Sequence, residues 1–359
     1  MPQPHLCLVN SLRTWGGAEV WFLETALALR DRGHQVSVVA QPDSELLRRC
    51  TVENIPVLPL AIRFDAAPWT LTRLTRFFRT RKVTSILTNL TKDLKAAAVA
   101  GRLAGVPIIL GSRESDFPLK NKAYYRWYFN NLATGLLVNS LATRKTTLQS
   151  APFLNPRKVH LVYKGIDLKR FRSGGLPGHQ VVGFAGQLIH RKGLATLMTA
   201  WSDMETRHPA TLRIAGDGVL MSELQTWRQT LQRPEGVEIL GPIDGMGSFY
   251  QSLNMLVMPS LSEGFGLVAA EAMACETPVI ATRTSSLPEI VTHEKTGLLI
   301  PVKDPAALSA AMENLLDNPE ESRKMGHAGR KFVQRNFDRE KTLDQLEALT
   351  GLLPRKATS

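Results

Sequence analysis

The sequence has little cysteine and lacks any long hydrophobic run. Its 359 residues include three cysteines, Cys7, Cys50 and Cys275, and their number and spacing fit neither a disulfide framework nor a metal-ligand motif. No run of 18 or more apolar residues is present, which argues against a membrane-spanning helix. The first residues lack the basic and long apolar segments of a secretory signal peptide. We therefore expect a cytoplasmic protein with free thiols.

Negative charge is scarce in only one half of the chain. Residues 1–160 hold 22 Lys and Arg against 10 Asp and Glu, whereas residues 161–359 hold 22 of each. The net charge of +12 therefore comes entirely from the N-terminal half. A basic half attracts polyanions such as nucleic acid, an anionic membrane surface or a phosphorylated substrate. The alternative is a well-solvated basic surface that serves solubility alone.

Short apolar runs alternate with amphipathic stretches along most of the chain. Strands of four to six residues between helical segments indicate parallel sheets with helices on both faces. Three glycines and a proline within residues 171–179 interrupt the alternation and predict a linker. The sequence therefore predicts two α/β domains. The predicted strands are 5–10, 35–40, 85–88, 107–110 and 135–139, then 181–185, 211–215, 237–240, 255–258 and 278–281.

A glycine-containing loop follows the predicted strand 255–258. One glutamate lies in this loop, and a second lies in the predicted helix after it. Ligands of open α/β sheets bind at the carboxyl ends of strands, where glycines let the backbone approach and a helix N-terminus favours anions. Glu271 lies on an otherwise apolar helix, so it needs hydrogen-bond donors, which sugar hydroxyls supply. The alternatives are that Glu263 caps the helix and that Glu271 pairs with a basic residue of the core. The segment comprises Glu263, Gly264, Phe265, Gly266, Leu267 and Glu271.

This segment resembles the signature of glycosyltransferase family 4, the glycosyl transferases of group 1. The resemblance implies a retaining enzyme of GT-B fold, an α/β architecture of two Rossmann-like domains whose parallel sheets face each other across a cleft. It also implies that Glu271 binds the ribose of a nucleotide donor and that Glu263 contacts the donor sugar, assisted by loop amides. Residues 1–170 would bind the acceptor and residues 171–335 the nucleotide sugar, with a C-terminal helix over 336–359 that packs back on the first domain.

Other segments match the family in order over nearly the whole chain. Gly16 and Gly17 resemble the N-terminal glycine loop that approaches the donor phosphate. Gly216 and Gly218 resemble the family's turn near the base. Residues 163–167 resemble the entry to the second domain, and residues 287–291 and 297–301 resemble its closing strands.

The loop after the strand 181–185 departs from the family at one position. A diphosphate leaving group needs fixed positive charge where no metal supplies it, and the family places an arginine directly after the first glycine and a lysine before the last. Gly186 and Lys192 match, but the arginine position holds Gln187. Arg191 is the obvious substitute, because its guanidinium suits phosphate oxygens. The alternative is that Arg191 and Lys192 are exposed loop charges.

The acceptor side departs further. Many family members have a histidine after the strand that here is 107–110, but this chain has Arg113, Glu114 and Asp116. Arg113 could bind a phosphate or hold the sugar, and either Glu114 or Asp116 could serve as general base. The alternative is a structural ion pair between Arg113 and Glu114. Glu114 and Asp116 also mimic an acidic metal motif, although we expect no metal.

Two stretches combine basic and aromatic residues, a composition that suits a membrane interface. The first, 69–82, places Leu71, Leu74, Phe77 and Phe78 roughly on one helical face, with arginines around it. The second, 120–129, has five aromatic residues and three cations. The alternative for each is an apolar face buried in the core. No known nucleic-acid-binding module is present.

We therefore expect a metal-independent hexosyltransferase-type enzyme that needs no cofactor besides its nucleotide diphosphate sugar. Its acceptor would be a glycan, glycolipid or lipid-linked molecule, as in the assembly of cell-surface polysaccharide or lipopolysaccharide. We expect it at the inner face of the cytoplasmic membrane, in peripheral contact with anionic lipid and not with nucleic acid. The alternatives are a same-fold enzyme with a small soluble acceptor and an inactive nucleotide-sugar-binding scaffold.

Overall fold

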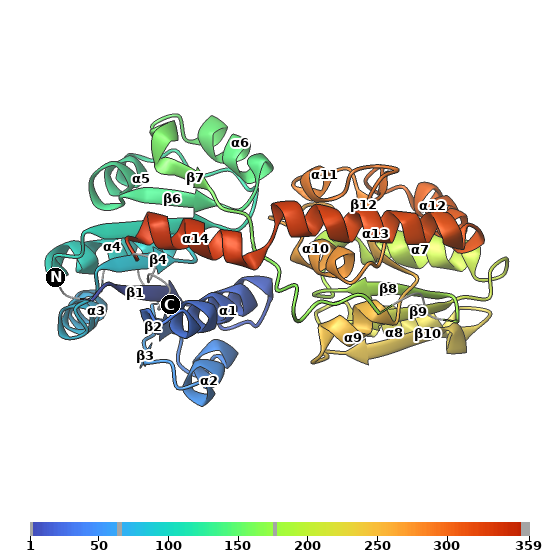
Figure 1. Ribbon diagram of the computed structural model, residues 1–359, viewed down its shortest axis with the longest axis horizontal. Helices are drawn as coiled ribbons and strands as arrows, with labels where there is room; N and C mark the ends of the chain where they lie inside the picture. Colours follow the sequence, from blue (N-terminus) through green and yellow to red (C-terminus); the bar gives the residue numbers. More distant parts are fainter. Residues whose placement is uncertain (1–2, 63–66, 175–177, 353–359) are drawn as a thin grey trace, which may run out of the picture. The chain divides into compact units, whose positions relative to one another are not determined.

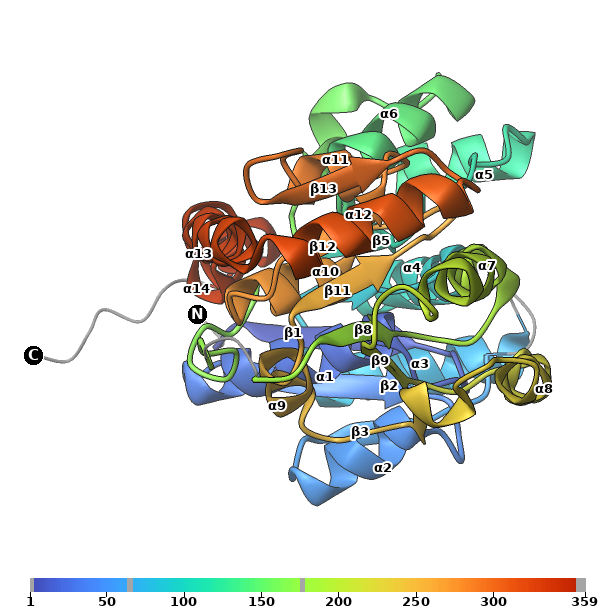
Figure 2. The same cartoon turned by 90° about the vertical axis from the view of Figure 1, so that its right-hand side faces the viewer.

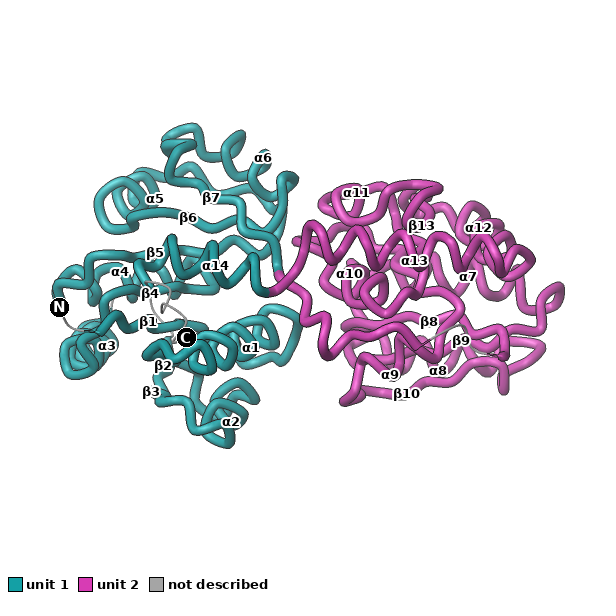
Figure 3. Tube along the Cα trace, in the orientation of Figure 1, with its two compact units in different colours: residues 1–164, 340–359 teal, residues 165–339 magenta. Residues whose placement is uncertain are grey.

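The computed structural model describes residues 3–62, 67–174 and 178–352. The chain divides into two compact units, shown in teal and magenta in Figure 3. Unit 1 comprises the residues up to 164 together with those from 340 onward, and unit 2 comprises residues 165–339. Each unit has its own parallel sheet covered by helices, as the alternating sequence pattern predicts.

Unit 1 is built on seven parallel strands in the order β3-β2-β1-β4-β5-β6-β7 (Figure 1). The strands are β1 (His5–Asn10), β2 (Gln35–Ala40), β3 (Val57–Pro59), β4 (Ser85–Thr88), β5 (Ile108–Arg113), β6 (Gly135–Val138) and β7 (Val159–Leu161). The helices are α1 (Gly17–Asp31), α2 (Glu45–Val52), α3 (Pro68–Thr80), α4 (Thr91–Ala104), α5 (Ala123–Trp127), α6 (Leu141–Ser150) and α14 (Arg339–Thr350), and a π-helical turn, Tyr128–Leu132, continues α5.

The strands of unit 1 are apolar on both faces because helices cover both faces. Along β1, Leu6 and Leu8 face the core that α1, α2 and α14 complete. Cys7 and Val9 alternate with them and face the core of α3 and α4. A strand that alternates between two cores needs a continuous apolar run, and this requirement explains the sequence of β1.

Unit 2 is built on six parallel strands in the order β10-β9-β8-β11-β12-β13. In Figure 2, α7 and α10 lie on opposite sides of this sheet, as right-handed crossovers in opposite directions require. The strands are β8 (Val181–Ala185), β9 (Thr211–Ala215), β10 (Val237–Gly241), β11 (Met255–Met258), β12 (Val279–Thr282) and β13 (Gly297–Ile300). The helices are α7 (Leu194–Met204), α8 (Met221–Gln229), α9 (Met246–Gln251), α10 (Leu267–Ala274), α11 (Leu287–Ile290), α12 (Pro305–Asp317) and α13 (Pro319–Asn336).

The chain enters unit 2 at Gly165, six residues before the predicted boundary at 171. Ile166 forms a parallel bridge with Asp338, and Arg339 donates to the Asp167 carboxylate at 2.7 Å, so this segment belongs with α13. Of the predicted linker 171–179, residues 175–177 lie outside the described residues.

The last helix, α14, belongs to unit 1. Arg32, just after α1, forms ion pairs with Glu340 at 2.6 Å and Asp344 at 2.8 Å. His34 contacts the buried Glu347 carboxylate at 2.8 Å. These contacts, with Leu343 and Leu346 in the core beneath them, attach α14 to the unit.

Candidate functional site

The strand order of unit 2 reverses between β8 and β11, and the predicted donor residues lie at this point. Strands β8 to β10 extend to one side of the sheet and β11 to β13 to the other. The loop after β8 carries Gly186 and Lys192, and the loop after β11 carries Glu263. The two loops are joined by a hydrogen bond from the Leu261 amide to the Arg191 carbonyl at 2.8 Å. A crevice at such a switch point is where open α/β sheets bind ligands.

Glu263 lies at the centre of a buried hydrogen-bonded group. Its Oε1 accepts from Lys192 Nζ at 2.5 Å and from Ser260 Oγ at 2.7 Å. The side chains of Lys192 and Glu263 are only 13% and 7% exposed. Lys192 is therefore a buried partner of Glu263 and not a solvated loop charge. Ser260 was missed by the sequence reasoning, although its position three residues before Glu263 was a usable signal.

Arg191 is held at the rim of the same group. Its Nη1 donates to the Ser262 carbonyl at 2.7 Å and lies 3.7 Å from Glu263 Oε2. The side chain is about one-third exposed, and Gln187 is exposed on the same loop. The structure thus places Arg191, and not Gln187, beside the Glu263 carboxylate.

Helix α10 begins directly after this loop. Its N-cap is Gly266, in the left-handed region at φ +94°, and no side chain caps it, so Glu263 is not the cap. The loop is fixed from beneath, because Ser286 Oγ donates to the Phe265 carbonyl at 2.8 Å and Thr282 Oγ1 to the Ser260 carbonyl at 2.5 Å. Gly264 and Leu267 flank this turn and are half-buried.

Glu271 lies buried on α10 among alanines. Its Oε2 accepts a hydrogen bond of 2.7 Å from the hydroxyl of Tyr250, on α9. The structure therefore gives this carboxylate a neutral hydroxyl donor. Tyr250 was not identified from the sequence, because nothing in the spacing from 250 to 271 links the two residues.

Gly216 and Gly218 allow two loops to approach each other closely. A Cβ on Gly216 would lie 1.9 Å from the Gly186 carbonyl oxygen, and one on Gly218 would lie 2.5 Å from the Leu188 carbonyl oxygen. The Leu188 amide also donates to the Asp217 carbonyl at 2.8 Å. These glycines are needed to bring the loops after β8 and β9 together, whatever else the turn binds.

The corresponding switch point of unit 1 lies between β1 and β4. The buried Glu19 of α1 accepts from Asn10, at the end of β1, at 2.9 Å and from Asn89, after β4, at 3.3 Å. Burial raises the pKa of Glu19, and the hydrogen bond from Asn10 opposes the rise. Gly16 and Gly17 form the start of α1, directly before this carboxylate.

Glu114 is paired with Lys164, not with Arg113. Lys164 Nζ lies 2.6 Å from Glu114 Oε2, and both side chains are largely buried. Ser112 donates to the other oxygen. Arg113 turns away and donates to Thr147 Oγ1 at 3.3 Å and to the Phe117 carbonyl. The alternative of an Arg113–Glu114 ion pair is therefore wrong.

Arg113 and Asp116 still influence one another. Burial lowers the pKa of Arg113, whereas the charges of Tyr125 and Asp116 raise it. Arg113, Glu114 and Asp116 thus lie on one segment, and Glu114 joins the polar group at the carboxyl ends of the strands. Lys164 completes that group and was missed, because it stands fifty residues from Glu114 in the sequence.

Asp93, at the start of α4, is fully buried at the same edge. Its Oδ2 accepts from the Ser11 amide at 3.1 Å. Among the described residues its Oδ1 has no hydrogen-bond partner. Burial raises the pKa of Asp93 from 3.8 to about 6.

Asp93→Asn should therefore stabilise the protein at pH 7.5, by up to about 3 kcal/mol for a shift of about two units. The folded state binds this proton more tightly than the unfolded state, so the wild type gains stability as the pH falls from 7 towards 4. The advantage of the variant should shrink over that range. Urea unfolding of both proteins at several pH values measures it. Asp31→Asn, at an exposed position, is the control, and a difference independent of pH would contradict the assignment.

The two basic aromatic stretches differ in burial. In α3, Leu74 and Phe78 are buried, and Leu71 and Phe77 pack against the same core. The apolar face of 69–82 is thus a core face, as the alternative interpretation expects.

The second stretch keeps aromatic side chains at the surface. Tyr124 and Trp127 are 43% and 53% exposed, and Phe117 nearby is 57% exposed, whereas Phe129 is buried. The cations Lys120, Lys122 and Arg126 are exposed among them. We call residues 117–127 the aromatic-basic segment.

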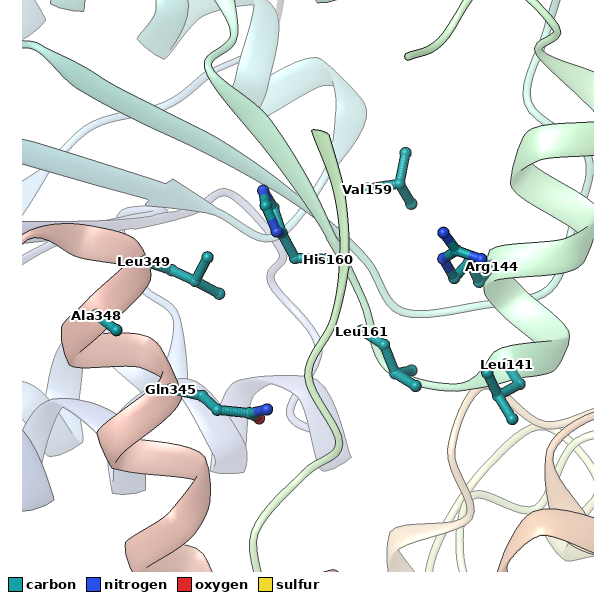
Figure 4. A pocket seen from close by; sticks show the side chains of 8 residues that line it. All are labelled: Leu141, Arg144, Val159, His160, Leu161, Gln345, Ala348 and Leu349. Carbon is teal, nitrogen blue, oxygen red and sulfur yellow. The ribbon is translucent and has the colours of Figure 1, made fainter. Parts of the chain in front are cut away.

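A groove of about 590 Å³ lies elsewhere on unit 1 (Figure 4). The edge strand β7 forms its floor, with α6 on one side and α14 on the other. None of the predicted site residues lines it. The lining residues are Leu141, Arg144, Val159, His160, Leu161, Gln345, Ala348 and Leu349.

Three further properties concern the part of the chain that the structure describes. No helix there is both long and apolar enough to span a bilayer. No group of three or more His, Cys, Asp or Glu is arranged to hold a metal ion in that part. The three cysteines are buried free thiols.

Comparison with known proteins assigns both halves of the chain. Residues 15–170 match the family model described as Glycosyltransferase Family 4. Residues 166–332 match the model described as Glycosyl transferases group 1. The two matches together run through both units.

Curated relatives are glycosyltransferases by name. The chain is 31% identical to the uncharacterized glycosyltransferase MJ1178 of Methanocaldococcus jannaschii over 235 residues, 64% of each chain. It is 32% identical to the D-inositol 3-phosphate glycosyltransferase of Segniliparus rotundus over 211 residues, 54% of this chain and 47% of that one. The matches thus span about half to two-thirds of the relatives' length.

Solved structures share the fold. The crystal structure of Anabaena Alr3699/HepE in complex with UDP has a TM-score of 0.84 at 19% identity and covers 97% of this chain and 100% of that one. Sucrose-phosphate synthase from Thermosynechococcus elongatus has a TM-score of 0.79 at 22% identity and covers 98% and 99% of the two chains. These likenesses confirm the predicted fold class, GT-B with two Rossmann-like domains.

Proposed function

Because this chain belongs to glycosyltransferase family 4, we propose that it transfers a sugar from a nucleotide diphosphate sugar to a hydroxyl of an acceptor. The observation that carries the proposal is the buried group of Glu263, Lys192 and Ser260 at the switch point of unit 2. A carboxylate there can accept sugar hydroxyls, and a lysine beside it can bind phosphate oxygens. The UDP bound by the HepE crystal structure is consistent with such a donor.

The donor would bind to both members of this ion pair. Lys192, held beside Glu263, would bind the leaving diphosphate together with Arg191, while Glu263 would also accept hydroxyls of the donor sugar. Charge fixed in advance around a leaving group stabilises the transition state without a metal ion. We therefore expect transfer in a chelator to match transfer with added Mg²⁺.

The remaining donor contacts rest on the family resemblance. Glu271 would bind the ribose hydroxyls, and the amides at the start of α10 and in the loops of Gly186, Gly216 and Gly218 would lie near the nucleotide. In unit 1, the resemblance assigns the backbone of Gly16 and Gly17 to phosphate binding. Retention at the anomeric carbon rests on the family resemblance, and the anomeric configuration of the product by NMR tests it.

Glu271→Ala tests the nucleotide assignment. Removing the carboxylate leaves the ribose hydroxyls unmatched, at about 1.5–3 kcal/mol per charged hydrogen bond, so affinity for the nucleoside diphosphate should fall at least about tenfold. Titration calorimetry with UDP, GDP and ADP measures it. The exposed Glu223 of α8, changed to alanine, is the matched control. Equal affinities in wild type and Glu271→Ala would reject the assignment.

On the acceptor side we propose Glu114 as the general base. Its carboxylate is held by Lys164 and Ser112 at the carboxyl end of β5, where an acceptor hydroxyl could donate to it. Arg113 and Asp116 would bind the rest of the acceptor.

The acceptor itself is proposed to be a glycan or a lipid-linked molecule. The second candidate is a small soluble acceptor, which the names of the inositol phosphate relatives favour. An inactive donor-binding scaffold is the third, and a protein that binds nucleotide sugars but releases no nucleoside diphosphate would support it.

The lipid acceptor predicts binding of unit 1 to anionic membranes through the aromatic-basic segment. Each basic residue near an anionic surface contributes about 1 kcal/mol, and exposed aromatic rings suit the interface. Sedimentation with phosphatidylglycerol vesicles should fall steeply with salt, because screening shortens to about 8 Å at physiological ionic strength.

Replacing Phe117, Tyr124 and Trp127 together by serine should abolish most of this sedimentation. Trp69→Ser removes an equally exposed ring on α3 and should leave it unchanged. A wild type that stays in the supernatant at low salt would favour the small soluble acceptor.

A further inference from the structure

Tyr250 is a buried polar side chain of unit 2 that the proposed chemistry leaves without a role. It lies on α9, fully buried. Its ring packs against Phe171 and Phe249, with centroids 6.0 and 5.8 Å away. Its carbonyl accepts from Thr277 Oγ1 at 2.8 Å. A phenylalanine would make all these contacts, so packing does not explain the hydroxyl.

The hydroxyl reaches Glu271. It donates to Oε2 at 2.7 Å, and both groups are buried. Burial, together with the neighbouring Glu271 charge, raises the pKa of Tyr250 well above its usual value of 10. The raised pKa favours the protonated phenol, which is the form that donates to the carboxylate. A donor of this kind fixes the direction of a carboxylate on an otherwise apolar helix.

We propose that Tyr250 is a positioning residue that orients the Glu271 carboxylate for the ribose hydroxyls and so sets the preference for ribonucleotides over deoxyribonucleotides. The inference rests on the proposed role of Glu271. A carboxylate meets two neighbouring hydroxyls well only in a narrow range of orientations, and a fixed orientation avoids the entropy cost of ordering it on binding. Without the phenol, the carboxylate loses one of the hydrogen bonds that direct it, and the contact to the ribose weakens.

This role predicts a change that lost stability alone would not produce. Tyr250→Phe should lower affinity for a ribonucleoside diphosphate by about fivefold, the equivalent of one hydrogen bond. It should lower affinity for the 2′- or 3′-deoxy analogue less, because part of the affected contact is already missing. The ratio of the affinity for the ribonucleoside diphosphate to the affinity for its deoxy analogue should therefore fall severalfold.

The test is titration calorimetry of the full chain with UDP, GDP and ADP and with their 2′-deoxy and 3′-deoxy analogues. The variants are wild type, Tyr250→Phe, Glu271→Ala and Thr277→Val. Thr277→Val removes a different hydroxyl that anchors the same turn of α9, so it controls for a purely structural effect. Circular dichroism confirms that each variant is folded.

We expect the wild type to prefer ribonucleotides, Glu271→Ala to lose the preference, Tyr250→Phe to reduce it and Thr277→Val to keep it. If the wild type binds no nucleotide, or shows no preference that Glu271→Ala removes, the proposed function of Glu271 is wrong. If Glu271→Ala removes the preference but Tyr250→Phe retains it in full, or if Thr277→Val reduces it equally, the inference about Tyr250 is overturned.

Discussion

Lys192→Met should slow glycosyl transfer by about 10²–10³-fold, the usual cost of removing one preorganised group that meets developing charge. Lys192 Nζ lies 2.5 Å from the Glu263 carboxylate and is largely buried, so its position is set before the donor arrives. Methionine keeps the apolar stem and removes the charge. Release of nucleoside diphosphate under saturating donor measures the rate.

Two neighbours on the same loop provide the controls. Gln187 lies at the position where the family has its arginine. Gln187→Ala should leave the rate unchanged, because this side chain is exposed. The transfer rate of Arg191→Ala should lie between those of Lys192→Met and Gln187→Ala, since the guanidinium is partly engaged by the Ser262 carbonyl. Equal rates in wild type and Lys192→Met would mean that the diphosphate is held elsewhere.

Glu114→Gln should reduce transfer by about 10²-fold or more, as expected for loss of a general base, while affinity for the nucleoside diphosphate stays the same. The amide keeps the shape of the side chain but cannot take the acceptor proton. Initial rates at saturating donor and acceptor, together with calorimetry of the nucleotide, separate the two effects.

Removing this charge leaves Lys164 buried without its partner, which can destabilise the fold. The double variant Glu114→Gln with Lys164→Met removes both charges and should be equally slow if Glu114 is the base. Asp116→Asn is the comparison for the alternative base on the same segment. If Asp116→Asn lost most of its transfer rate while Glu114→Gln kept a normal rate, Asp116 and not Glu114 would be the general base.

Much of the architecture could be predicted because the strands of both sheets are buried on both faces. Such strands require continuous apolar runs, and the runs at 35–40, 85–88, 181–185, 211–215 and 255–258 coincide with β2, β4, β8, β9 and β11. The edge strands β3 and β7 were missed. Each has only three residues, and β3 ends in Pro59, so neither shows the length or composition of a strand.

The site could be predicted only where its residues are close in the sequence. Glu263 and Glu271 share one loop and helix, and Arg191 and Lys192 share another loop. Partners from distant segments, such as Tyr250 beside Glu271 and Lys164 beside Glu114, depend on how helices and strands pack, which no local pattern encodes. The α3 face shows the converse, because its amphipathic pattern is the same whether membrane or core covers it.

The central claim is that the group around Glu263 and Lys192 binds a nucleotide diphosphate sugar and breaks the bond between the sugar and the diphosphate. The most direct measurement is the release of nucleoside diphosphate when purified protein is incubated with a panel of UDP-, GDP- and ADP-sugars. We predict release from at least one of them in the wild type, whether to added acceptor or to water, and almost none in Lys192→Met. Binding of a nucleotide sugar with no release from any member of the panel, with or without acceptor, would contradict the account and leave a donor-binding scaffold.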